Sequence, residues 1–150
     1  MASIRSRIGE NMEDRYLFKG KRLDNGEWEI GSLIALPTGE YEISNKCNNP
    51  PDCDPMWDKV VITHKVEPST ICQCTGLQDK NGNLIWENDI AKGHRISFDG
   101  HRHIGKVKYI NGRYEIIGVK QYAGFSDALS LSYEVLGNIF DNPELLESEG

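Results

Sequence analysis

The sequence lacks three features, and each absence excludes a class of protein. No uninterrupted apolar stretch approaches the roughly 20 residues that a membrane-spanning helix needs. The N-terminal segment, MASIRSRIGENMEDRYLF, has no apolar stretch of the kind that signal peptides contain. Apolar residues almost nowhere recur at the spacing of an amphipathic helix. These absences argue against a membrane partner, predict a soluble, cytoplasmic protein, and leave a fold built mainly from strands.

A surplus of positive charge is also missing, because 17 Lys and Arg face 23 Asp and Glu for a net charge of −6. Indiscriminate nucleic-acid binding depends on neutralising phosphates, so the total charge disfavours it. One segment, here called the basic segment, reverses this balance: residues 92–108 carry a net charge of +4 and three of the four histidines. Its candidate binding residues are Lys92, Arg95, Arg102, His103, Lys106 and Lys108.

Glycine, by contrast, is abundant at 15 residues, and four glycines follow Asn or Asp. Asn-Gly and Asp-Gly supply the positive φ angles that two-residue hairpin turns require. The pairs are Asn25-Gly26, Asn81-Gly82, Asp99-Gly100 and Asn111-Gly112. Between the turns, the sequence predicts strands over Tyr16–Leu23, Glu27–Leu36, Tyr41–Ser44, Met56–Val66, Leu84–Lys92, His94–Phe98, His103–Ile110, Tyr114–Lys120 and Leu131–Phe140.

This pattern predicts a mainly β protein, made of small antiparallel sheets or a barrel, with little helix. We expect a flexible leader over residues 1–14, an N-terminal β region with a hairpin over 15–66, and a C-terminal β-barrel region over 67–150. The only helical candidates are turns near Ser69–Leu77, within Gln121–Leu129, and after Pro143, which suits the first position of a helix.

The four cysteines do not match a structural zinc site. Such sites usually present thiolates in pairs two to four residues apart on tight turns. Cys47 and Cys53 are too far apart in sequence, and Cys72 and Cys74 flank Gln73 in a segment predicted to be extended. We therefore expect reduced thiols, no metal and no cofactor.

The acidic residues give no catalytic constellation. Asp79 begins a segment that resembles a calcium loop, but the twelfth position, which should be Glu, is Ile90. A hairpin turn fits that segment better. Glu87 and Asp89 alternate along a predicted strand and so share a face, where we expect them to be solvated rather than catalytic. The sequence therefore predicts a protein that is not an enzyme.

The strand predicted over His103–Ile110 leaves two interpretations open. Ile104, Lys106 and Lys108 share one face, and His103 shares the other with Val107. The strand is either half-exposed, with lysine stems lying over apolar surface, or part of a groove for an acidic partner or a nucleic-acid backbone.

Three stretches resemble the YopX family of phage and prophage proteins, in both order and spacing. They are RYLFKGKRLDNGEWEIGSLI from residue 15, TGLQDKNGNLIWENDIAK from residue 75, and EVLGNIFDNPELL from residue 134. The resemblance implies a mainly β fold whose C-terminal part is similar to a Src-homology-3-type barrel, and it implies no known activity. The chain departs from the family pattern at Asn88, where Gly is usual, and Asn is well tolerated if positive φ is needed there.

We expect a phage- or prophage-encoded accessory protein of the bacterial cytoplasm that binds a host or phage protein. Its contact surfaces would be the loops Lys46–Pro55 and Gln121–Ser130, and self-association through sheet edges is a further expectation. The alternative is a nucleic-acid-binding module that uses the basic segment.

Overall fold

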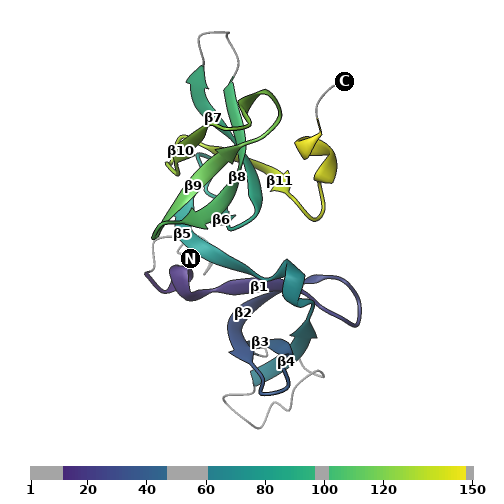
Figure 1. Cartoon of the computed structure of the whole chain (residues 1–150). Coiled ribbons are helices and arrows are strands. Elements are labelled where there is room, and N and C mark those ends of the chain that lie inside the picture. The colour runs from purple at the N-terminus through teal and green to yellow at the C-terminus, as the bar shows by residue number, and fades with distance from the viewer. Residues whose placement is uncertain (1–11, 47–60, 97–101, 148–150) are drawn as a thin grey trace. The chain divides into compact units, whose positions relative to one another are not determined.

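The computed structural model describes residues 12–46, 61–96 and 102–147, which form strands joined by tight turns and short 3-10 helices (Figure 1). In chain order, the elements are η2 (Met12–Tyr16), β1 (Phe18–Lys21), β2 (Trp28–Ala35), β3 (Tyr41–Lys46), β4 (Val61–Val66), η3 (Pro68–Thr70), β5 (Cys72–Gln78), β6 (Leu84–Trp86), β7 (Asp89–Ile96), β8 (Arg102–Ile110), β9 (Arg113–Gly118), η4 (Lys120–Tyr122), β10 (Ser126–Ala128), β11 (Glu134–Asn138) and η5 (Pro143–Leu146).

The strands pair in two antiparallel sheets, which confirms the mainly β prediction. Hydrogen bonds join them in the orders β4-β3-β2-β1-β5-β6 and β10-β9-β8-β7-β11. Within the described ranges the second sheet is open, since β10 and β11 lie at its two ends. The chain divides into two compact units, one over Tyr16–Gln73 and the other over residues 12–15 and 74–147, so that the boundary falls inside β5.

In the first unit, the predicted N-terminal hairpin forms between β1 and β2. Gly26 has a φ of 73°, but Asn25 is not among the residues with positive φ, and the turn spans residues 22–27 rather than the two residues predicted. Gly31 of β2 lies so close to β3 that a Cβ atom there would be 2.1 Å from the carbonyl oxygen of Ser44. Only glycine therefore permits this approach of the two strands. A bridge between Arg22 and Val66 links the end of β1 to β4.

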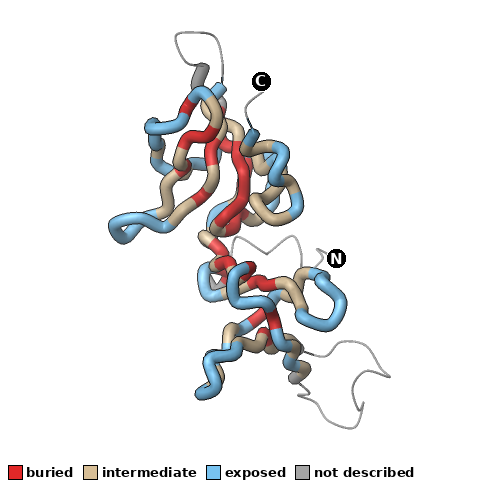
Figure 2. Tube along the Cα trace, turned by 45° about the vertical axis from the view of Figure 1, so that its right-hand side comes forward, coloured by how far each residue is buried: buried red, intermediate tan, exposed pale blue. Residues whose placement is uncertain are grey.

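The second unit is built on the meander of β7, β8 and β9, in which β8 runs between its two neighbours (Figure 1). Asn111 and Gly112 both have positive φ, 53° and 83°, in the turn between β8 and β9. Buried residues lie mainly on the strands, whereas the turn between β8 and β9 is exposed (Figure 2). The core cluster of this unit consists of Ile85, Ala91, Val107, Ile116 and Tyr133.

The strand predicted over Leu84–Lys92 is divided in two by a turn at Asn88. Asn88 has a φ of 70° and is buried; its N–H donates to the carbonyl of Val107 at 2.8 Å. Asn therefore occupies the positive-φ conformation that a usual glycine would adopt more easily. Asp89 is not solvated as we expected, since it is 3% exposed and accepts a hydrogen bond from the Trp86 N–H at 2.8 Å.

Other predictions differ from the structure at their boundaries or fall outside the described residues. Most of the helical candidate at Ser69–Leu77 is strand β5, and Gln121–Leu129 contains only the end of η4 before β10. The turn after Pro143 is the 3-10 helix η5. Several predicted features lie outside the described residues: the leader up to residue 11, the loop at 47–55, the start of the strand at 56, Cys47, Cys53, and the Asp99-Gly100 turn.

Asp79 organises the turn between β5 and β6, which is the predicted hairpin rather than a calcium loop. One carboxylate oxygen accepts the N–H groups of Asn81 and Asn83 at 2.8 and 2.9 Å, and the other accepts the N–H of Val135 at 2.9 Å. Burial is the largest single influence on the Asp79 pKa and raises it, but the hydrogen bonds together outweigh burial. The pKa therefore lies below its ordinary value.

We predict that Asp79→Asn lowers the free energy of unfolding at pH 7 by about 1–3 kcal/mol, because amide donors lose a charged acceptor. Because the pKa of Asp79 is lowered on folding, its ionised carboxylate stabilises the folded state at pH values above the unfolded-state pKa of about 3.9. This stabilisation is lost as the pH falls through the pKa of the folded state. Urea denaturation should therefore show the variant and the wild type converging in strong acid. Glu40→Gln, at an exposed pair with Lys65, is the control and should change little. If the free energies of unfolding of Asp79→Asn and the wild type differ as much in strong acid as at pH 7, this account is wrong.

Candidate functional site

Strand β8 separates the predicted binding residues onto two faces. Lys106 and Lys108 lie on the face of Ile104, whereas His103 lies on the opposite face with Val107, which belongs to the core. This confirms the predicted alternation, but it divides the basic segment into two environments. Of the other candidates, Arg102 is exposed, Lys92 on β7 is half-buried, and the side chain of Arg95 lies outside the described part of the chain.

The lysine face is interrupted by negative charge. The strand register places Glu134 opposite Lys92 and Glu115 opposite Lys108. The ion pairs of these glutamates are with other residues, Glu134 with Lys80 at 3.3 Å and Glu115 with Arg113 at 2.6 Å. The ammonium group of Lys108 also donates to the side-chain oxygen of Asn88 at 2.5 Å. Lys108 is therefore engaged within the protein, and two carboxylates lie next to this face, which weakens the case for a continuous basic patch.

His103 belongs to a hydrogen-bonded relay that the sequence did not reveal. Its Nδ1 lies 3.0 Å from the hydroxyl of Tyr133, and that hydroxyl donates to the carboxylate of Asp127 at 2.9 Å. The three residues come from β8, from the residue before β11, and from β10. Gly93 makes room for the ring of Tyr133, since a Cβ atom at residue 93 would lie 2.9 Å from that ring. We call these three residues the His103 relay.

The relay fixes the position of the imidazole proton. The Tyr133 hydroxyl has one hydrogen, which it gives to the Asp127 carboxylate, so its oxygen is left to accept a hydrogen bond. Nδ1 of His103 must then carry the proton, which leaves Nε2 of the neutral ring as an acceptor. This assignment follows from the network geometry. Among the described residues, Nε2 is buried without a hydrogen-bond partner, and the hydroxyl of Tyr122 is in the same situation.

The segment that covers the relay is unusual in other ways. Lys120, the first residue of η4, has a φ of 58°, which is uncommon for a residue with a side chain. Phe125 and Leu131 are 66% and 63% exposed. We call residues 119–133 the relay segment. It overlaps the loop Gln121–Ser130 that the sequence marked as a contact surface.

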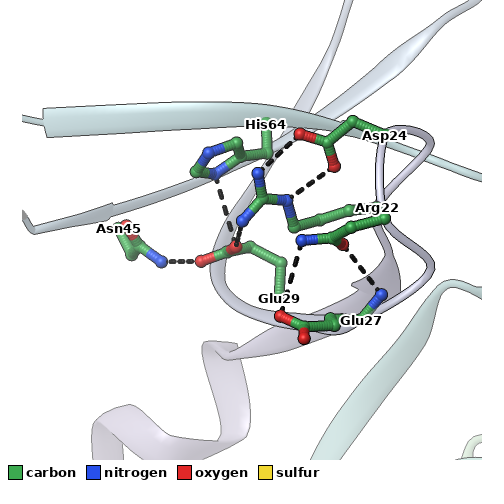
Figure 3. A network of polar contacts seen from close by, with 7 residues as sticks. Arg22, Asp24, Glu27, Glu29, Asn45 and His64 are labelled. Carbon is green, nitrogen blue, oxygen red and sulfur yellow. Dashed lines mark hydrogen bonds and ion pairs between the residues drawn. The ribbon is translucent and has the colours of Figure 1, made fainter. Parts of the chain in front are cut away.

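The first unit contains a separate polar network centred on Glu29 (Figure 3). The side-chain amide of Asn45 donates to one carboxylate oxygen, and the other lies 3.3 Å from Nδ1 of His64 and 3.8 Å from the guanidinium of Arg22. Arg22 also makes two hydrogen bonds to Asp24, at 2.9 and 2.6 Å. The side chain of Glu29 is 12% exposed, so this carboxylate accepts one hydrogen bond and lies close to two basic side chains in a largely enclosed position.

The charges of this network favour one another. The hydrogen bond from Arg22 holds the pKa of Asp24 below its ordinary value, and the same bond raises the pKa of Arg22. None of these residues was singled out by the sequence, because Arg22, Glu29 and His64 lie on three different strands or turns and form no motif. The network has the character of a structural element that fixes the β1–β2 turn against β4.

The remaining reactive groups have structural surroundings. Cys72 and Cys74 are buried thiols, and the Cys72 thiol donates to the carbonyl of Thr70 at 3.2 Å. Burial, with a smaller contribution from Glu87, raises the pKa of Tyr114 to about 12, so its phenol is neutral. In the part of the chain that the structure describes, no three His, Cys, Asp or Glu side chains are grouped to hold a metal ion. Nor do residues 12–46, 61–96 and 102–147 include a helix long and apolar enough to cross a bilayer.

Comparison with known proteins assigns the fold. The family model of the YopX protein matches residues 18–147. The chain belongs to the YopX family. The solved structure of YopX from Bacillus subtilis is 17% identical, has a TM-score of 0.53, and the match covers 91% of this chain and 99% of that one. Protein EF1440 from Enterococcus faecalis is 22% identical, with a TM-score of 0.44 and coverages of 87% and 96%.

At such identities, the likeness of this YopX-family chain to the Bacillus subtilis structure shows the fold alone. No curated protein sequence matches the chain. The recognition of the family from its three sequence stretches is confirmed. The comparisons assign no activity.

We predict that Glu29→Gln destabilises the first unit by about 1–2 kcal/mol, because Arg22 and His64 lose their charged partner in an enclosed site. Amide exchange at Ile43, which is buried in this unit, should become faster in proportion. Glu27→Gln is the matched control, since Glu27 is exposed and its side-chain carboxylate accepts a hydrogen bond from the neighbouring turn residue Asn25. Equal effects of the two substitutions would show that the network contributes little.

Proposed function

We propose that this YopX-family chain is a phage- or prophage-encoded protein-interaction module without enzymatic activity, and that its contact surface is the relay segment. The observation that carries the proposal is the exposure of Phe125 and Leu131, at 66% and 63%, within this segment. Aromatic side chains supply much of the energy of protein interfaces. On this proposal, the partner is a host or phage protein in the bacterial cytoplasm.

The base of the segment supports this assignment. Tyr133 is hydrogen-bonded to His103 at 3.0 Å and donates to Asp127 at 2.9 Å. Gly118 donates to the carbonyl of Phe125 at 2.7 Å. A contact surface that is held from below loses less conformational freedom when a partner binds. The segment therefore combines exposed apolar side chains with a partly preorganised backbone.

The relay favours binding over catalysis. An Asp–Tyr–His chain has the connectivity of an acid–base relay, but Nε2 of His103 is shielded from solvent, so a substrate does not reach it in this conformation. We propose that the relay positions the segment and performs no chemistry.

Self-association is a second form of the same proposal. The edge strand β10 is poorly suited to pairing with another chain, because the N–H of Ala128 is taken by the carboxylate of Asp127 at 3.0 Å. A second copy would therefore meet the relay segment through the side chains of Phe125 and Leu131. Nucleic-acid binding has less support, since Glu115 and Glu134 lie across from Lys108 and Lys92.

The test is capture from a nuclease-treated bacterial lysate with the tagged chain and a double variant, Phe125→Ser with Leu131→Ser. We expect the double variant to capture about tenfold less of its specific protein partner, as for substitutions of central interface residues. Leu23→Ser, at a residue of the first unit that is also exposed, is the control and should capture normally.

A second variant separates the nucleic-acid alternative. Lys106→Glu with Lys108→Glu should leave protein capture unchanged. If capture instead depends on these lysines, disappears with nuclease and survives in the Phe125 and Leu131 variant, then the interaction-module proposal is wrong.

A further inference from the structure

Two neighbouring rings in the second unit each bury a polar atom without a partner. The rings of His103 and Tyr122 meet edge to face, with centroids 5.3 Å apart and planes at 74°. Nε2 of His103 and the hydroxyl of Tyr122 are both buried and make no hydrogen bond within the described part of the chain. Tyr122 as a whole is 6% exposed.

This arrangement is unfavourable for the closed segment. A buried donor or acceptor that lacks a partner loses its hydrogen bonds to water and gains nothing in return. Here an acceptor nitrogen and a hydroxyl are both in that position. Lys120, two residues before Tyr122, adds a left-handed backbone conformation that side chains disfavour. Three unfavourable features therefore coincide in η4 and the residue it covers.

Hydrogen bonds to the sheet hold the two ends of this segment. Val119 donates to the carbonyl of Ile104 on β8 at 3.0 Å, and the carbonyl of Phe125 accepts from Gly118 on β9 at 2.7 Å. Between these points, the bonds are internal to the segment: Tyr122 donates to Val119, and Ala123 to Lys120, both at 3.1 Å. Residues 120–124 can thus move away from His103 while both ends stay attached to the sheet.

We propose that residues 120–124 form a lid over His103, and that opening of this lid uncovers a hydrogen-bond acceptor for a ligand. Opening lets water reach both unpartnered atoms and relaxes Lys120, which offsets part of the stability that the closed state gains from burying the Tyr122 ring. The His103 relay keeps the proton on Nδ1, so Nε2 is presented as an acceptor. The chemical class that fits it is an N–H or O–H donor. This inference concerns the free protein and holds whether or not the relay segment binds a partner.

The test compares two Tyr→Phe variants by amide hydrogen exchange. Tyr122→Phe removes the unpartnered hydroxyl, stabilises the closed lid, and should slow exchange at residues 122 and 123 by about tenfold. Tyr133→Phe makes the same chemical change on the adjacent ring, whose hydroxyl bonds both His103 and Asp127, and it should accelerate exchange there. The amide of Val119, which is attached to β8, serves as the reference.

The position of the ring proton is a second measurement. A ¹⁵N spectrum of the His103 ring at neutral pH should show the proton on Nδ1 and a bare Nε2. The proposal is overturned if exchange in Tyr122→Phe is unchanged or faster, because the hydroxyl then has a stabilising partner. It is equally overturned if the proton lies on Nε2, because that nitrogen is then not an acceptor.

Discussion

Backbone N–H groups at the ends of short strands must find acceptors, and in this protein the side chains of Asp and Asn supply them. Asp79 takes three such groups, including the N–H of Val135 on β11. Asp89 takes that of Trp86, and the side chain of Asn142 takes that of Asn138 at 3.1 Å. An unpaired buried amide costs about as much as a lost hydrogen bond. Strands of three to five residues persist because these side chains complete their hydrogen bonding.

The two units are stabilised by different kinds of interaction. The second unit gathers an apolar cluster between its strands, including Ile85, Val107 and Ile116. In the first unit, few residues are fully buried, Ile43 and Val66 among them, and an enclosed ion-pair network around Glu29 ties the turn to β4. Interactions of that kind contribute geometry more reliably than they contribute net stability. Such a network sets where the β1–β2 turn lies relative to the strand that carries His64.

Local chemistry made much of the fold predictable from the sequence. Asn111-Gly112 marks its hairpin because only a few residue types adopt two successive positive φ angles, and the alternation along β8 follows from strand geometry. The candidate site was less accessible. His103 was named with the lysines as part of one basic segment, and although strand alternation placed it on the opposite face, that alternation does not show what the face contacts. Tyr122, Asp127 and Tyr133 meet it only through the pairing of strands distant in sequence, and no spacing rule encodes that meeting.

Asp127 has two structural roles, one for each of its carboxylate oxygens. One carboxylate oxygen covers the N–H of Ala128 at the edge of the sheet, and the other holds Tyr133 and, through it, His103. A single charge therefore protects the edge from pairing with another chain and also anchors the segment above the relay. A change that removed this charge would expose an aggregation-prone edge at the same moment as it released the anchor. Protection of the sheet edge and attachment of the segment thus depend on the same side chain.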